Sequence, residues 1–139
     1  MNIDILFRAK RKDNGEWVQG FYVKCRGHHY ILPVYDKDHG FDERYSDWVK
    51  VDSKTVCQYT GLTDKNGRKI FEADILKRVL LPTKRIKNNF KIVFVSANSC
   101  FSAIDLDGSN VTFISDYINS NYEIEVIGNI FDNPELMEV

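Results

Sequence analysis

A short basic segment is the part of the sequence with the clearest chemical potential. Between residues 77 and 91 the chain carries six cations and no acid, interleaved with apolar positions. Cations at this density can follow a phosphate backbone, and an aromatic ring among them can stack on a base. The candidate nucleic-acid-binding residues are Lys77, Arg78, Lys84, Arg85, Lys87 and Lys91, with Phe90 or Phe94 as the stacking ring.

The same segment has two explanations that involve no nucleic acid. Lysines on a solvated hairpin suppress the pairing of its edges with other strands. They can also meet acids of a neighbouring subunit. Every one of the 19 Lys and Arg residues falls at or before Lys91, and all charged residues after it are acidic. Such a charge split favours pairing between neighbouring molecules as well as within one molecule.

Two carboxylates, Glu72 and Asp74, lie two positions apart at the start of a predicted strand. This spacing aims both side chains to one side, as the metal site of a nuclease or the acid pair of a glycosidase requires. The alternative is that they cap the entry into the strand, and we favour capping. A metal-dependent nuclease is therefore the third hypothesis.

His28 and His29, with His39, Asp36 and Asp38, form the one local cluster of side chains that commonly bind metals. Adjacent strand residues point to opposite faces, so the two neighbouring histidines do not easily share an ion. Metal sites usually have a repeated helical or C-x-x-C spacing, which is missing here. We expect a polar loop and no metal site.

No other motif indicates catalysis. Residues 105–110 begin like a calcium loop but lack its spacing and its closing glutamate, so we expect a hairpin turn there. No Ser, Cys or Thr stands in a nucleophile motif, and no glycine-rich phosphate-binding motif occurs. We therefore expect no enzymatic activity, no cofactor and no small-molecule substrate.

The composition is that of a folded intracellular protein. The chain has 139 residues, of which 43% are hydrophobic, 13% aromatic and 28% charged, enough to bury the core of one compact unit. Its apolar runs are far too short to cross a bilayer, and the early Asp4 argues against a secretory signal. Its 3 cysteines are widely spaced and predict free thiols. We expect a cytoplasmic protein.

Alternating apolar and polar residues, rich in β-branched and aromatic types, predict strands almost throughout. In the first half, Asn14-Gly15 supplies the positive φ angles of a tight hairpin. Residues 35–46 are polar and predict a loop, and a boundary between two parts follows near residue 54. The strands predicted in this half span residues 3–10, 17–26, 28–34, 47–51 and 55–59.

The second half has turn signals at Asn66-Gly67 and Asp107-Gly108. Residues 82–88 predict a solvated link, and residues 115–119 suit one 3₁₀ turn. Predicted strands span residues 74–81, 89–96, 100–106, 111–114 and 122–130. Five short strands joined by tight turns are typical of a small SH3-like barrel. The prediction is thus a mainly β protein, with a hairpin-rich region over residues 1–54 and an SH3-like barrel over residues 55–139.

Two long segments carry a family resemblance. Residues 55–76, TVCQYTGLTDKNGRKIFEADIL, and residues 125–136, EVIGNIFDNPEL, resemble the signature of the YopX family of phage and prophage proteins. The opening FRAK at residues 7–10 and WVQG at residues 17–20 are similar to the family's start. The family has glycine where this chain has Cys57 and Ala73, so the backbone there must tolerate a Cβ.

The resemblance implies a phage or prophage origin, a mainly β fold with an SH3-like barrel in the second half, and no established activity. Our leading hypothesis is a non-enzymatic interaction or assembly module in the bacterial cytoplasm, a homo-oligomer that associates through β edges and opposite charges. The alternative is a nucleic-acid-binding β-barrel that uses the basic segment at residues 77–91.

Overall fold

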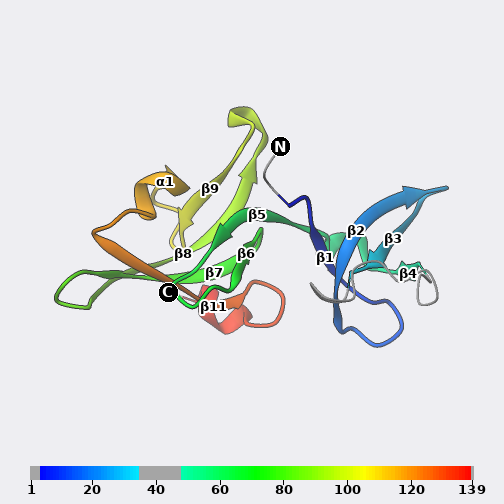
Figure 1. The fold of residues 1–139 in the computed structure, drawn as a ribbon, viewed down its shortest axis with the longest axis horizontal. Coiled ribbons are helices and arrows are strands. Elements are labelled where there is room, and N and C mark those ends of the chain that lie inside the picture. Colours follow the sequence, from blue (N-terminus) through cyan, green and yellow to red (C-terminus); the bar gives the residue numbers. More distant parts are fainter. Residues whose placement is uncertain (1–3, 35–47, 139) are drawn as a thin grey trace. The chain divides into compact units, whose positions relative to one another are not determined.

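A computed structural model gives the fold of the chain and describes residues 4–34 and 48–138 (Figure 1). It contains two compact units, unit 1 (Met1–Tyr59) and unit 2 (Thr60–Val139). Both are built mainly from antiparallel strands, so the predicted fold class is confirmed at that level. The boundary expected from sequence, after residue 54, lies slightly earlier in the chain. No helix in the described ranges has the length and apolar character to cross a membrane.

The first sheet has six strands in the order β4-β3-β2-β1-β5-β6, and unit 1 contains its part from β4 to the start of β5. One face of this sheet carries a small core of Ala9, Ile31 and Val51. They share a face because residues opposite each other in the register, and residues two apart on one strand, point to the same side of the sheet. The elements are β1 (Phe7–Lys10), β2 (Trp17–Cys25), β3 (His28–Pro33), β4 (Val49–Lys50), the 3₁₀ turn η2 (Ser53–Thr55) and the start of β5 (Cys57–Thr63).

The tightest turn of unit 1 joins β2 to β3. Arg26 and Gly27 have φ angles of 51° and 78°, and positive φ at both central residues is the geometry of a two-residue hairpin. The hairpin predicted at Asn14-Gly15 is present between β1 and β2, but only its glycine has a positive φ. That loop is wider than predicted, and a hydrogen bond from the Arg11 N–H to the Glu16 carbonyl closes it at 2.8 Å.

Unit 2 contains a five-stranded antiparallel sheet with the order β10-β9-β8-β7-β11. Its core is larger than that of unit 1 and is centred on Leu76, Phe90, Ile92 and Ala103. The elements are the end of β5, β6 (Lys69–Phe71), β7 (Asp74–Leu80), β8 (Arg85–Val95), η3 (Ser96–Asn98), β9 (Cys100–Asp105), β10 (Val111–Phe113), α1 (Ile114–Tyr117), β11 (Tyr122–Asn129) and η4 (Pro134–Met137).

The Asp64 side chain holds the turn between β5 and β6. Its Oδ1 accepts the N–H groups of Asn66 and Arg68 at 2.9 Å each, and its Oδ2 accepts the N–H of Val126 at 3.0 Å. Burial acts to raise the pKa of Asp64, but the three backbone donors outweigh it, so the pKa lies below its ordinary value. The turn predicted at Asn66-Gly67 is confirmed, and the aspartate that organises it belongs to the first family-like segment.

Several predicted elements differ from those observed. The solvated link at residues 82–88 is wrong in part, because β8 begins at Arg85. Polar residues form strand there since the outer part of β8 is an exposed edge that pairs with β7 alone among the described strands. Residues 115–119 do not form a separate 3₁₀ turn, because a one-turn α-helix, α1, already covers Ile114–Tyr117. No described pairing joins β10 to β11, so closure into an SH3-like barrel stays a prediction. The loop predicted at residues 35–46 lies outside the described residues.

Candidate functional site

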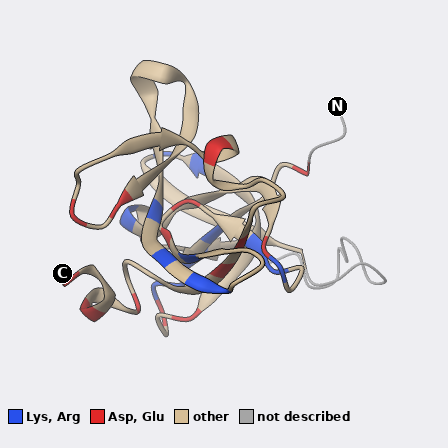
Figure 2. Cartoon of the chain, turned by 90° about the vertical axis from the view of Figure 1, so that its left-hand side faces the viewer, with Lys and Arg blue, Asp and Glu red and all other residues tan. Residues whose placement is uncertain are grey.

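The basic segment forms a protruding hairpin of β7 and β8. Leu80 pairs with Arg85 at its end, and the register shifts between Arg78 and Val79, which leaves one extra residue on β8. Strand β9 pairs with β8 only from Phe90 onward, so the outer part of β8 has a partner on one side alone among the described strands. The hairpin projects to the left of its unit in Figure 1, and Figure 2 views the molecule from that side.

Three of the predicted cations lie at the tip of this hairpin. Lys84, Arg85 and Lys87 are exposed, and no hydrogen bond or ion pair of their side chains occurs within the described chain. Lys84 has a φ of 58°, which turns the backbone at the end of the loop. Ile86, between the cations, is 64% exposed. The tip therefore presents three positive charges around one apolar side chain. We call these residues, Lys84, Arg85, Ile86 and Lys87, the hairpin tip.

The remaining lysines of the segment lie in a different setting. Lys77 is half-buried, and its Nζ lies 3.4 Å from the Glu125 carboxylate on β11. Lys65 lies 3.7 Å from the same carboxylate and 3.8 Å from that of Glu123. The opposite charges of the two parts of the chain thus pair within unit 2. Lys91 is half-buried in the middle of the sheet, where its backbone faces Ile75 of β7.

Arg78 belongs to the core side of the hairpin. It is only 9% exposed, and its guanidinium carbon lies 3.8 Å from the ring centroid of Tyr117 and 4.5 Å from that of Tyr122. Its Nε donates to Asn88 Oδ1 at 2.8 Å. A cation between two rings and an amide is fully engaged in the fold. Arg78 is therefore removed from the set of residues available to a phosphate.

Asp105 completes a polar network around that arginine. Its Oδ1 accepts the Asn88 amide at 2.7 Å and the Tyr117 hydroxyl at 2.8 Å, and its Oδ2 accepts the Asn110 amide at 3.0 Å. Burial raises the pKa of Tyr117, and the hydrogen bond to Asp105 raises it further. Sequence reasoning missed this network. The available signal was the alternation of Leu76, Arg78 and Leu80, which places the arginine on the apolar face of β7.

Phe90 does not serve as a stacking surface. Its exposure is 0%, and its ring packs edge-on against Tyr117 with the centroids 4.9 Å apart. A base cannot reach a ring that has no exposed surface, so this part of the prediction is corrected. Phe94, the second ring considered, is 44% exposed and packs edge-on against Phe101 at 5.2 Å.

The Glu72 and Asp74 carboxylates both bind backbone groups. Asp74 is 1% exposed, and its Oδ2 accepts the Phe71 N–H at 2.8 Å across the turn into β7. Glu72 Oε2 accepts the Phe94 N–H at 3.4 Å. The contact of Asp74 is the capping interaction that the sequence favoured over a metal pair.

The histidine and calcium-like segments also have structural roles. His29 stacks on Tyr22 with the ring centroids 5.8 Å apart, while His28 is exposed and contacts Tyr30, so the two lie on opposite faces as predicted. His39, Asp36 and Asp38 lie outside the described residues. Residues 105–110 form the predicted hairpin turn. Within the described ranges, no three His, Cys, Asp or Glu side chains are grouped to hold a metal ion.

Comparison with known proteins identifies relatives at two levels. A family model described as YopX protein matches residues 6–138. The crystal structure of protein EF1440 from Enterococcus faecalis is similar in fold, with a TM-score of 0.56 and 24% sequence identity over 99% of this chain and 100% of that chain. At this identity the likeness shows the fold alone. A search of curated proteins found no match.

Proposed function

Since the chain belongs to the YopX family, we propose that it is a phage-derived, non-enzymatic binding module. In this proposal the tip of its β7–β8 hairpin contacts nucleic-acid phosphates. The observation that carries the proposal is the hairpin tip. Lys84, Arg85 and Lys87 are exposed there, and no acid lies between residues 75 and 104. The proposal includes no cofactor and no small-molecule substrate.

The shape of the hairpin supports a duplex as the ligand. The tip combines the turn after Leu80 with the outer part of β8, which has β7 as its one described partner, so its cations can reach the phosphates on the walls of a duplex groove. Proteins that bind in this way often place an apolar side chain between base steps. Ile86, 64% exposed between the cations, is in the position for such a contact.

A fluorescence polarisation titration with a short DNA duplex tests the proposal. The variant Lys84→Ala/Arg85→Ala/Lys87→Ala is compared with Lys24→Ala/Lys54→Ala/Arg68→Ala, which removes the same charge from exposed sites outside the hairpin. Loss of three phosphate contacts makes the plot of log affinity against log salt concentration less steep, by about 2 to 3 in slope. We expect this loss in the hairpin variant alone. Equal weakening in both variants, or no binding by the unmodified protein at low salt, would reject the proposal.

Self-association is the second candidate function, favoured by the edge strand β10. Its Val111 and Phe113 side chains are 57% and 59% exposed, and β9 is the one described strand that pairs with it. An exposed apolar edge is a template for pairing with another chain. The charge attraction that the sequence suggested is weaker support, because Lys65 and Lys77 already meet acids of the same unit.

Light scattering at low and high salt tests the assembly candidate. A homo-oligomer that Phe113→Lys converts to a monomer supports it, because a charge on an edge strand opposes pairing. A monomer at micromolar concentration under both salt conditions removes it.

The proposal also includes a location in the bacterial cytoplasm. It assigns unit 2 to the class of SH3-like barrels, which its short antiparallel strands support.

A further inference from the structure

The unit 1 sheet has a second face that is unusually apolar. In the register of β2, β3 and β4, Phe21 lies opposite Leu32, and Val23 lies opposite Tyr30, which in turn pairs with Lys50. Trp48, two residues before Lys50, contacts Tyr30 edge-on with the ring centroids 5.9 Å apart. These six residues point away from the Ala9, Ile31 and Val51 core. We call them the aromatic face: Phe21, Val23, Tyr30, Leu32, Trp48 and Lys50.

The aromatic face is open to solvent where a polar surface is expected. Phe21 is 48% exposed and Trp48 is 51% exposed, and the other four residues are half-buried or exposed. An antiparallel sheet with one buried face normally carries polar side chains on the other. A contiguous apolar patch of this kind marks a place where something binds.

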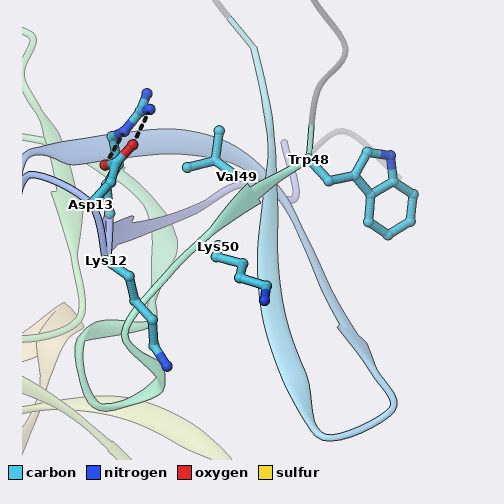
Figure 3. Close-up of a pocket in the computed structure, with 6 residues that line it drawn as sticks. Lys12, Asp13, Trp48, Val49 and Lys50 are labelled. Atoms are coloured by element: carbon cyan, nitrogen blue, oxygen red, sulfur yellow. Dashed lines mark hydrogen bonds and ion pairs between the residues drawn. The ribbon is translucent and has the colours of Figure 1, made fainter.

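A shallow hollow with unpaired cations adjoins Trp48. Its volume is about 380 Å³, and Figure 3 shows Lys50 between Lys12 and Trp48. Arg11 is neutralised locally, because its Nε and Nη2 donate to the Asp13 carboxylate at 2.9 and 2.8 Å. No ion pair or hydrogen bond of the Lys12 or Lys50 side chain occurs in the described parts of the chain. The hollow therefore keeps two positive charges beside an exposed indole.

We propose that the aromatic face binds single-stranded nucleic acid, with bases stacked on Trp48 and Phe21 and a backbone phosphate between Lys12 and Lys50. Planar apolar groups joined by negative charges are the ligand that exposed rings and neighbouring lysines fit. No acid occurs from residue 17 to residue 35, so the strands β2 and β3 do not repel a polyanion. A duplex is excluded as the ligand, because its bases are already stacked on one another.

The inference rests on the proposed function, because both take nucleic acid as the ligand. The two sites are distinguished by whether the bound nucleic acid is double- or single-stranded. The hairpin tip is assigned to a duplex, and the aromatic face to a single strand. Loss of duplex binding in the hairpin variant with single-strand binding retained would uphold the hairpin tip as the duplex site. Loss of single-strand binding in Trp48→Ala with duplex binding retained would uphold the aromatic face. Single-strand binding by a protein that does not bind the duplex would uphold the aromatic face alone.

The test uses the full chain, oligothymidylate and the matched duplex. Stacking on an aromatic side chain contributes about 1 to 3 kcal/mol per base, so Trp48→Ala and Phe21→Ala should each weaken oligothymidylate binding about tenfold or more. Trp48→Phe keeps a ring and should retain most of the affinity. Lys12→Ala/Lys50→Ala should lower the salt slope by about 1, as expected for one phosphate held by both lysines.

Phe113→Ala is the matched control, since it removes a ring of similar exposure, 59%, from unit 2. Circular dichroism establishes that each variant is folded. No oligothymidylate binding by the unmodified protein overturns the inference, as does equal weakening by Phe113→Ala. A dimer that dissociates on Trp48→Ala, without oligonucleotide binding, also overturns it and assigns the face to a second copy of the chain.

Discussion

The guanidinium carbon of Arg78 lies over the ring of Tyr117, 3.8 Å from the ring centroid. This relationship joins β7 to the helix α1, and Asn88 and Asp105 extend it to β8 and β9. One cation of the basic segment is thus part of the packing of unit 2. The number of cations in a sequence therefore overstates the number that a ligand can meet.

Replacement of Arg78 should destabilise the protein while every cation of the hairpin tip is kept. Arg78→Met keeps much of the volume but leaves the Asn88 carbonyl oxygen without its charged donor. We expect the free energy of unfolding to fall by about 2 kcal/mol, the range for a hydrogen bond to a charged group. Urea denaturation measures the change. Arg78→Lys should recover part of it, because lysine keeps the charge but not the planar fork. A change below about 0.5 kcal/mol, the level of an ordinary surface substitution, would contradict the role assigned to the network.

The Asp64 carboxylate should make stability depend on pH in acid. The pKa of Asp64 is lower in the folded state than in the unfolded state, where it is about 3.9. The carboxylate therefore stabilises the fold above the unfolded-state pKa, and this stabilisation is lost as the pH falls through the folded-state pKa. Asp64→Asn should lower the free energy of unfolding at neutral pH by about 1 to 3 kcal/mol. The difference from the unmodified protein should shrink as the pH falls below about 4.

Urea unfolding at a series of pH values measures this difference. Asp116→Asn is the control, because it removes a charge from an exposed position of α1. If the Asp64→Asn difference stayed constant down to the acid limit, the carboxylate would not be the source of the effect.

Gly20 should tolerate no side chain. A Cβ at this position would collide with the carbonyl oxygen of Leu32 and would lie 2.9 Å from the Cα of Pro33. Both atoms belong to the neighbouring strand backbone, so the sheet itself must move. Gly20→Ala should lower the free energy of unfolding by about 1 to 3 kcal/mol or more, as overpacking does. Thermal unfolding beside Gln19→Ala, the exposed neighbour on β2, separates this clash from a general effect of alanine.

Replacing Ala73 with glycine should stabilise the protein. Its φ is 72°, in the left-handed region where a Cβ costs about 1 to 2 kcal/mol. After allowance for the greater freedom of the unfolded glycine chain, Ala73→Gly should raise the free energy of unfolding by about 0.5 to 1 kcal/mol. Ala9→Gly removes the same methyl group from a buried strand position and should have the opposite sign. Destabilisation of similar size at both positions would show that backbone strain at Ala73 is negligible.

Sequence alone predicted most strands of unit 2, because β7, β8 and β9 are short runs of mostly apolar residues bounded by turn signals. It failed where one residue type has two roles. Arg78 and Phe90 were assigned to a ligand by chemical type, but their partner Tyr117 comes from a distant part of the chain. The exposed cations Lys84, Arg85 and Lys87 were identified correctly as residues of a solvated tip. The one local signal for the buried cation was its place between Leu76 and Leu80 on the apolar face of β7.

The network below the hairpin has a consequence for recognition at its end. Because Arg78 and Asn88 lock β7 and β8 together, the backbone that carries the cations is preorganised before any partner arrives. Less conformational entropy is then lost on association, and affinity is gained without additional contacts. A variant that weakens the Arg78–Asn88 contact should therefore bind a ligand of the hairpin tip more slowly or release it faster, even though every charge of the tip is intact.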